Sequence, residues 1–424
     1  MNSEHELGHV PNFLIGDTMS MVASATHQDV LRARLLTDHL FAQALPEAFY
    51  DRPIRERHRL IFYVGHLDAF DWNLFAKGVL GLPAVEPELD SLFAFGIDPA
   101  PGNLPDDKAT DWPELLEVRR YVSRVRENID RVLARAPEKV MRMILEHRLM
   151  HAETLTYLLH NLPYSKRLTR MRGVRSRALS EPRQSEFIRI PAGTATLGLR
   201  RDSSFGWDNE FDLHTCSVDA FAMTKYKVTN GQYLQFVKDG GPVPHYWMER
   251  SGEFRYRGFN GESALPEGCP VYVSYKEAVA YADWAGKALP SEAQYHRAAF
   301  GAPSGPERPF AWGNDAPGRA HGNFDFAYSD AVPVTENTSG DSAFGVSQLV
   351  GNGWEWTSSK FSPFGGFAPD PLYPGYSADF FDGEHLVVKG ASCATDHMLL
   401  RRSFRNWFRE SYRYAYTTFR LVEK

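Results

Sequence analysis

Cysteine is scarce in this sequence, which contains only Cys216, Cys269 and Cys393 among its 424 residues. So few cysteines do not indicate a disulfide scaffold and are typical of a reducing compartment, so we expect a cytoplasmic protein. An apolar run of about 18 residues, long enough for a membrane-spanning helix, is also missing. The first residues, MNSEHELGHV, lack the basic and apolar regions of a signal peptide. We therefore expect no membrane partner.

An excess of positive charge is missing as well. The formal net charge is −6 at pH 7, and no basic run is long enough to indicate a nucleic-acid partner. Hydrophobic residues make up 43% and charged residues 24% of the chain, which are the proportions of a soluble globular protein. The chain is too long for one ordinary core, so we expect two or three domains.

The first 168 residues are predicted to be helical. Four amphipathic segments, each with an apolar side, cover 26–45, 57–80, 111–135 and 137–161. Thr26 is expected to cap the first segment, and Asp111 with Glu114 is expected to form a capping box at the third. Four such helices predict a four-helix bundle. The polar, basic stretch 169–185 has no periodicity and is predicted to be a linker.

His147 and His151 lie four residues apart in the last predicted helix, so both face the same side, toward the expected bundle core. The second helix carries His66 in an equivalent stripe. Three neutral imidazoles on one side of an ion would leave its other side open for substrate and oxygen. Imidazole suits Fe(II), Zn(II), Cu and Ni alike, and purely structural core histidines remain the alternative. Glu153, one of the few acids near this stripe, is expected to form a salt bridge on the helix surface, with metal binding as the alternative.

The connection between the second and third helices, 81–110, is rich in Pro, Gly and Asp. Loops of this length inside a compact domain are often functional. It contains the apolar stretch Leu92–Asp98, which we expect to fold over another part of the domain.

The second half of the chain is rich in glycine, proline and aromatic residues and has few long helices. Two strands joined by a turn are predicted between Phe187 and Gly198. Three helices are predicted, and the residues expected to cap them are Thr229 or Asn230, Ser274 with Glu277 in a capping box, and Ser291.

Motifs in this half resemble the formylglycine-generating-enzyme (sulfatase-modifying factor) domain, a C-type-lectin-like fold. They are VTNGQYLQF, PVYVSYKEAVAYADWAGKALPSEAQYHRAA, GNGWEWTSS, VVKGAS and the closing FR, and the resemblance covers nearly all of 187–424. That family has an oxidising cysteine pair near its C-terminal glycine-serine motif. Here Cys393 follows Gly390-Ala-Ser392 directly and no second cysteine follows it, so we do not expect formylglycine formation.

The three histidines resemble the metal motif of DinB-like bundle domains. A DinB-like bundle (1–168) ahead of the lectin-like domain (186–424) is similar to the ergothioneine-pathway sulfoxide synthases (EgtB-like) and the related selenoneine synthases (SenA-like). The segments PLYPGYSADFFDG and SFRNWFR also resemble those families. The resemblance implies an α+β oxidoreductase with non-heme Fe(II) bound by His66, His147 and His151. Such an enzyme uses O₂ to join sulfur or selenium to imidazole C2 of hercynine (Nα-trimethylhistidine).

The same resemblance implies the residues that hold the substrate. Trp407 is the candidate aromatic wall for the trimethylammonium group, whose charge cannot donate ordinary hydrogen bonds. Asn406 is the candidate anchor for the hercynine carboxylate. Tyr373 and Tyr376 lie in the region that supplies a tyrosine near the iron, a candidate proton donor. The alternatives are a core tryptophan and tyrosines that only pack a loop.

Three departures from the sulfoxide synthase pattern bear on the chalcogen donor. Met150 replaces a glutamine that holds the hercynine imidazole, and Phe408 replaces an acid that holds the amine of γ-glutamylcysteine. The loop sequence LFAFGIDPAPG lacks the paired tyrosines of cysteine-using forms. A site without these polar contacts should discriminate against an amino-acid thiol. The loop resembles the selenoneine synthase branch, so a selenosugar donor is favoured, with cysteine or γ-glutamylcysteine as the alternative.

Two functions from other classes remain open. One is a DinB-type metal-dependent thiol transferase or hydrolase, with Zn(II) in place of iron. The other is a non-catalytic binding protein, because many lectin-like folds only bind their ligands.

Overall fold

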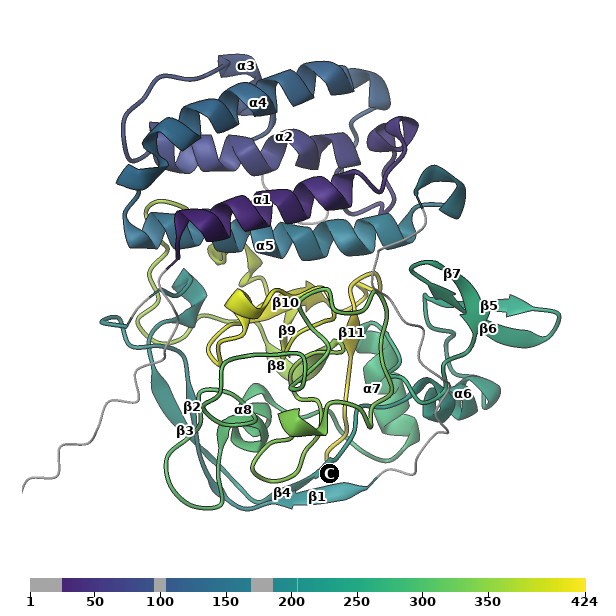
Figure 1. Cartoon of the computed structure of the whole chain (residues 1–424). Coiled ribbons are helices and arrows are strands. Elements are labelled where there is room, and N and C mark those ends of the chain that lie inside the picture. The colour runs from purple at the N-terminus through teal and green to yellow at the C-terminus, as the bar shows by residue number, and fades with distance from the viewer. Residues whose placement is uncertain (1–24, 95–103, 169–185, 204) are drawn as a thin grey trace, which may run out of the picture.

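The computed structural model describes residues 25–94, 104–168, 186–203 and 205–424. A layer of long helices lies on a second half of short strands and helices (Figure 1). The helices of the first half are α1 (His27–Phe41), α2 (Leu60–Asp71), α3 (Pro87–Leu92), α4 (Leu115–Val132) and α5 (Glu138–Asn161). Helix α1 packs along α5, and α2 packs between α4 and α5. The predicted linker, 169–185, and part of the apolar loop lie outside the described residues.

The capping residues predicted from the sequence explain the start of some helices but not of others. Thr26 and Asp29 form the predicted cap of α1. Helix α2 begins at Leu60, later than predicted, and continues as a π-helical turn, Trp72–Lys77. The capping box predicted at Asp111 is wrong, because this carboxylate accepts the backbone N–H of Lys108 at 2.7 Å, ahead of the helix.

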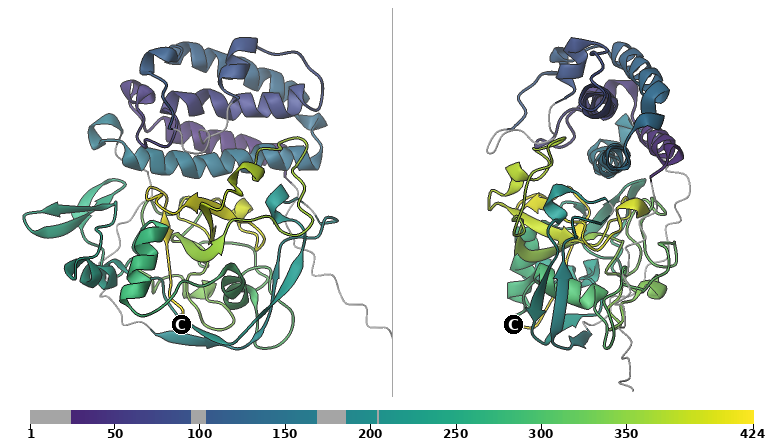
Figure 2. Two further views of the ribbon diagram at one scale, coloured as in Figure 1. Left: turned by 180° about the vertical axis from the view of Figure 1, so that it is seen from behind. Right: turned by 90° about the vertical axis from the view of Figure 1, so that its left-hand side faces the viewer.

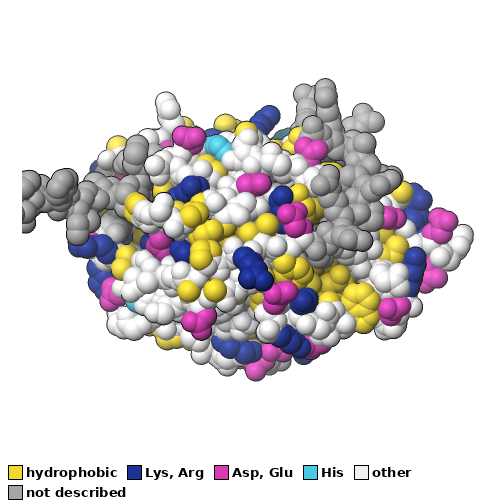
Figure 3. All heavy atoms as spheres, turned by 90° about the horizontal axis from the view of Figure 1, so that it is seen from below, with side chains coloured by type: hydrophobic (Ala, Val, Ile, Leu, Met, Phe, Trp, Pro, Cys, Tyr) yellow, Lys and Arg dark blue, Asp and Glu magenta, His cyan; other side chains and the backbone are white. Residues whose placement is uncertain are grey.

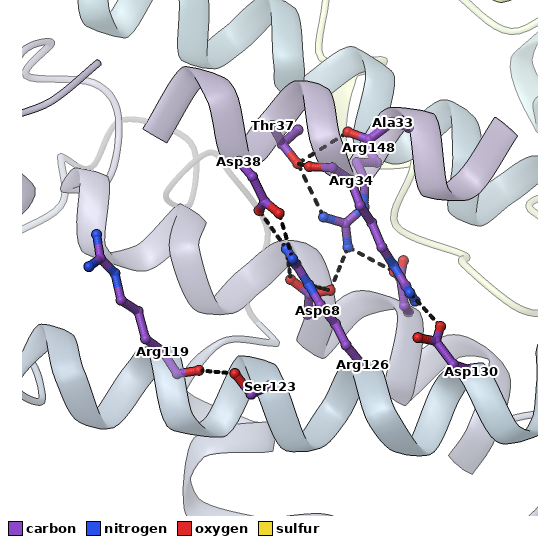
Figure 4. Close-up of polar contacts among 11 residues, drawn as sticks. Ala33, Arg34, Thr37, Asp38, Asp68, Arg119, Ser123, Arg126, Asp130 and Arg148 are labelled. Atoms are coloured by element: carbon purple, nitrogen blue, oxygen red, sulfur yellow. Dashed lines mark hydrogen bonds and ion pairs between the residues drawn. The ribbon is translucent and has the colours of Figure 1, made fainter. Parts of the chain in front are cut away.

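Buried ion pairs join the helices on the side of α5 that carries Arg148 (Figure 4). The Arg148 guanidinium donates to Asp68 at 2.9 Å and to Asp71 at 2.8 Å, both on α2. Arg126 of α4 bonds the same Asp68 at 3.0 Å and Asp38 of α1 at 2.7 Å. Buried charges of this kind are costly to leave without a partner, so the network fixes how the helices pack.

The described part of the second half contains several small sheets and three α-helices. Its strands are β1 (Phe187–Ile190), β2 (Gly193–Leu197), β3 (His214–Val218), β4 (Phe221–Thr224), β5 (Trp247–Arg250), β6 (Glu253–Gly258), β7 (Gly261–Ala264), β8 (Trp354–Lys360), β9 (His385–Lys389), β10 (Asn406–Arg409) and β11 (Thr417–Thr418). Its helices are α6 (Asn230–Lys238), α7 (Tyr275–Trp284) and α8 (Glu292–Phe300). Thr229, Ser274 and Ser291 cap these helices, which confirms the prediction.

The strands pair with partners farther along the chain than the sequence indicated. Both predicted strands near the start of this half form, but β1 pairs with β4 and β2 pairs with β3, so they do not form a hairpin with each other. The remaining sheets are β5-β6-β7 and a four-stranded sheet in the order β10-β9-β8-β11. The four-stranded sheet lies beneath α5 (Figure 1).

Helix α5 is the bundle helix nearest the second half (Figure 2). Five of its residues, spaced three or four positions apart as on one helix face, contact that half. They are Glu146, Met150, Glu153, Tyr157 and His160. His147 and His151 of the predicted metal site lie on the neighbouring face of the same helix, so α5 carries both the domain contact and two of the three candidate ligands.

The opposite face of the second half has no dominant charge. Lysine, arginine, aspartate and glutamate side chains are interspersed on the face seen in Figure 3. None of the helices in the described part of the chain is both apolar and long enough to span a bilayer.

Candidate functional site

His66, His147 and His151 lie together in the core of the bundle. Each offers one ring nitrogen, and these nitrogens all lie within 4.8 Å of one another. The Nε2 atoms of His147 and His151 are 3.2 Å apart. All three side chains are buried, with at most 3% of each residue exposed.

Contacts around the rings fix which nitrogen points inward. His66 Nδ1 donates to the carbonyl oxygen of Phe93 at 2.7 Å, which leaves the Nε2 lone pair for the group. His66 stacks on Phe62 at 4.7 Å, and His147 stacks on Phe70 at 3.5 Å. Phe93 is buried at the start of the apolar loop, so the described beginning of that loop contacts the histidine group. Residues 95–98 of the loop lie outside the described residues.

The electrostatics favour neutral imidazoles. Burial lowers the pKa of His66 to about 4 and the pKa values of His147 and His151 well below the ordinary value of 6.5. Neutral rings keep the lone pairs that a metal ion requires. His66 Nε2 is buried and has no hydrogen-bond partner among the described residues. Facing lone pairs on buried nitrogens repel each other unless a proton or cation lies between them, so this group fits a metal ion.

The two tyrosines of the PLYPGYSADFF segment reach this site from the second half. The Tyr373 ring lies 5.2 Å from that of Phe70 and 6.4 Å from that of His147. The Tyr376 hydroxyl lies 3.3 Å from Sδ of Met150, which precedes His151 on α5. Tyr373 and Tyr376 are 5.7 Å apart.

The three candidate residues of β10 lie on two faces of the strand, because side chains alternate. Trp407 is partly buried, stacks on Phe361 at 4.1 Å and lies 5.6 Å from Tyr376. Asn406 Oδ1 accepts the backbone N–H of Trp407 at 2.8 Å, which leaves its NH₂ group as the donor for a ligand. Phe408 lies on the face of the strand opposite Trp407 and stacks on Tyr412 at 5.2 Å.

Trp207 and Glu146, which no sequence pattern selects, complete the surroundings of Tyr376. Trp207 stacks on the Tyr376 ring at 4.0 Å. The Trp207 indole N–H donates to Glu146 Oε2 at 3.0 Å. Trp207 and Glu146 are 61 positions apart, so neither periodicity nor motif spacing could have paired them.

The prediction of a surface salt bridge for Glu153 is wrong. This residue is 7% exposed, and its carboxylate accepts hydrogen bonds from Trp354 Nε1 at 2.7 Å, Ser392 Oγ at 2.6 Å and Thr395 Oγ1 at 2.8 Å. Burial raises the pKa of Glu153. The helical periodicity placed Glu153 beside the core stripe but could not show that a second domain covers that side of the helix.

A second group of potential ligands consists of Asp325, Asp396 and His397. Asp396 already forms a bidentate ion pair with Arg32 of α1, at 2.7 and 3.2 Å. His397 Nδ1 lies 3.0 Å from an oxygen of Asp325. These contacts give the group a structural role at the edge of the domain interface.

Comparison with known proteins identifies the family. Residues 175–424 match the sulfatase-modifying factor enzyme 1-like domain. The hercynine oxygenase of Mycobacterium tuberculosis is 32% identical over 314 residues, which cover 68% of this chain and 73% of that protein. The chain belongs to the hercynine oxygenase family. Ergothioneine biosynthesis protein 1 of Neurospora crassa is 28% identical over 91% of this chain, and the match spans 56% of that protein's length.

Membership of the hercynine oxygenase family agrees with the missing cysteine pair, which formylglycine-generating enzymes have near the glycine-serine motif. The formylglycine-generating enzyme of Mycobacterium tuberculosis is 28% identical over only 42% of this chain. All three cysteines of the chain are free, and Cys393 is buried. The loop that carries Cys393 holds Glu153 through Ser392 and Thr395, so in this member of the hercynine oxygenase family it joins the two halves.

Proposed function

We propose that this chain is a non-heme Fe(II), O₂-dependent enzyme that forms a carbon–chalcogen bond at imidazole C2 of hercynine. The observation that carries the proposal is the buried three-histidine group in the helical half, with Tyr373 of the second half 6.4 Å from the ring of His147. The name of the similar mycobacterial protein, hercynine oxygenase, supplies the substrate.

His66, His147 and His151 would hold the iron through Nε2. Iron would supply the oxygen chemistry, and three protein ligands leave coordination positions for substrates. Holding hercynine and the donor side by side replaces a bimolecular encounter, an effect worth up to about 7–11 kcal/mol in well-oriented systems. The atoms balance: C2–H and the donor Se–H or S–H each lose a hydrogen. One oxygen atom ends on the chalcogen, and the other leaves as water.

Residues of the second half would bind and orient hercynine. Trp407 presents an aromatic face to the trimethylammonium group. We assign the carboxylate to the Asn406 NH₂ group, because Oδ1 is already engaged by the backbone. Tyr373 or Tyr376 would supply the proton at the reacting oxygen, and the aromatic surroundings would exclude water.

A selenosugar is our favoured donor. Phe408 packs on Tyr412 and has no charge to offer an amino group, and the Met150 thioether contacts the Tyr376 hydroxyl. Neither side chain can make the polar contact that the resemblance implies at its position, which is a contact with the hercynine imidazole for Met150 and with a donor amino group for Phe408. A sulfoxide synthase that uses cysteine or γ-glutamylcysteine is the second candidate, supported by Ergothioneine biosynthesis protein 1 among the relatives. A DinB-type thiol transferase is a third, because the same histidines suit Zn(II).

Oxygen uptake and product mass test this function. The protein is reconstituted anaerobically with Fe(II) and given hercynine with the selenosugar, cysteine or γ-glutamylcysteine in separate reactions. We expect hercynine-dependent O₂ uptake and a hercynine–selenium conjugate. Efficient turnover of the thiols alone would overturn the selenium donor. Thiol transfer with Zn(II) and no O₂ uptake would overturn the oxygenase itself.

A further inference from the structure

Trp207 contacts the site from the second half, although it lies far in sequence from every predicted site residue. It is 2% exposed. Its ring stacks on Tyr376 with the centroids 4.0 Å apart and the planes inclined by 20°. Its indole N–H donates to Glu146 at 3.0 Å, and Glu146 directly precedes His147.

These contacts link four side chains in a closed circuit, which are Glu146, Trp207, Tyr376 and Met150. Glu146 and Met150 lie one turn apart on α5, so both point toward the second half. Glu146 accepts from Trp207, Trp207 stacks on Tyr376, and the Tyr376 hydroxyl returns to Met150 at 3.3 Å. The helical turn between Glu146 and Met150 carries His147, and His151 directly follows Met150.

Trp207 is itself fixed by a buried charge network. Arg401 donates to both oxygens of Glu146, at 2.8 and 2.9 Å, and also to Glu210. Glu210 accepts the backbone N–H of Trp207 at 2.9 Å. The same tryptophan is therefore held at its backbone and at its indole nitrogen by carboxylates that share one guanidinium.

We propose that Trp207 is a positioning residue that fixes the Tyr376 phenol against Met150, the residue that precedes His151 on α5. A thioether is a weak acceptor, so the hydroxyl contact with Met150 holds the phenol loosely. The indole of Trp207 stacks at 4.0 Å, nearer than the rings of Trp407 at 5.6 Å and Tyr373 at 5.7 Å, so it supplies the main restraint. Because Trp207 bonds Glu146 of α5 and also stacks on Tyr376, the packing of the two halves against each other also sets the position of Tyr376. The inference rests on the proposed function in that Tyr376 acts in the reaction.

The test combines two substitutions with a readout of Tyr376 itself. Trp207→Phe keeps an aromatic face and loses the bond to Glu146, whereas Trp207→Leu loses both. Trp312→Phe is the matched control, because this tryptophan stacks on His321 at 4.6 Å and bonds only a backbone oxygen. 3-Fluorotyrosine incorporated at position 376 reports the phenol by ¹⁹F NMR, without any need for bound metal.

We expect one sharp ¹⁹F signal in the wild type and in Trp312→Phe, and broadened or multiple signals in Trp207→Leu. The kcat of Trp207→Leu should fall about 10- to 100-fold, as misplacement of a reacting group does. Its hercynine Kd and iron content should stay unchanged, and Trp207→Phe should lie between wild type and Trp207→Leu.

A single sharp signal and wild-type kcat in Trp207→Leu would overturn the inference. If Trp207→Leu does not fold, Trp207→Phe decides in the same way: a broadened signal with lower kcat supports positioning, and wild-type values refute it. A wild-type enzyme inactive toward hercynine would defeat the proposed function instead, and the ¹⁹F comparison would still report on Trp207.

Discussion

The carboxylate of Glu153 in α5 accepts a 2.7 Å hydrogen bond from the indole N–H of Trp354, the first residue of β8. The same carboxylate accepts from Ser392 and Thr395. One buried side chain on the histidine-bearing helix thus holds two separate segments of the second half, both of which belong to the motifs that mark this family.

Glu153→Ala is expected to destabilise the protein. Leaving the Trp354 N–H without an acceptor costs about 1–3 kcal/mol, and the loss of the two hydroxyl contacts adds to it. Thermal or denaturant unfolding measures the loss. Substitution of the exposed Glu249 by alanine is the control and should leave stability unchanged. Wild-type stability in Glu153→Ala would show that the carboxylate does not join the domains.

Removing one histidine should abolish metal binding. His151→Ala takes away one of three ligands and is expected to lose the ion, whereas His39→Ala, at an exposed position of α1, should retain it. Metal analysis after anaerobic loading with Fe(II) and desalting gives the stoichiometry. Full retention of iron by His151→Ala, with folding intact, would place the ion elsewhere.

Trp407→Leu should weaken hercynine binding more than Trp407→Phe does. A desolvated cation–π contact contributes about 0.5–2 kcal/mol, which corresponds to an increase of about 2- to 30-fold in Kd. Calorimetric titration measures both variants. Equal affinities for hercynine in wild type and Trp407→Leu would mean that the trimethylammonium group lies elsewhere.

The stability of the protein should fall as the pH drops below 6.5. Burial lowers the pKa of His160 well below 6.5, and the ring bonds Tyr416 at 3.0 Å and the carbonyl of Arg257 at 2.8 Å. The unfolded chain takes up a proton near pH 6.5 and the folded chain does not. The stabilisation is therefore complete above pH 6.5 and is lost toward the lowered pKa.

His160→Gln tests this linkage. Each such proton contributes a slope of up to about 1.4 kcal/mol per pH unit, so the variant should lose stability less steeply than wild type as the pH falls. Denaturant unfolding of the metal-free protein at a series of pH values measures the slopes. Parallel curves would show that His160 titrates alike in both states.

Some of the fold could be predicted because its signals are local. The caps of α1 and α7 follow from Thr26 and Ser274 with an acid three residues later, and the helix period alone put His147 and His151 on one face. His66 could be selected because an equivalent apolar stripe surrounds it. These predictions depend on contacts within one element.

The rest depends on how the two halves meet, which no local pattern records. Glu153 was misplaced because its partners are more than two hundred positions away, at Trp354 and Ser392. Trp207 was missed for the same reason. The alternation along β10, which puts Trp407 beside Tyr376 and Phe408 against Tyr412, shows its consequences only once the neighbouring segments are in place.

A crystal structure of the protein soaked anaerobically with Fe(II) and hercynine tests the central claim most directly. We predict iron bound to Nε2 of His66, His147 and His151, with the trimethylammonium group of hercynine against Trp407. Iron at Asp325, Asp396 and His397, or hercynine bound away from the three histidines, would contradict the account.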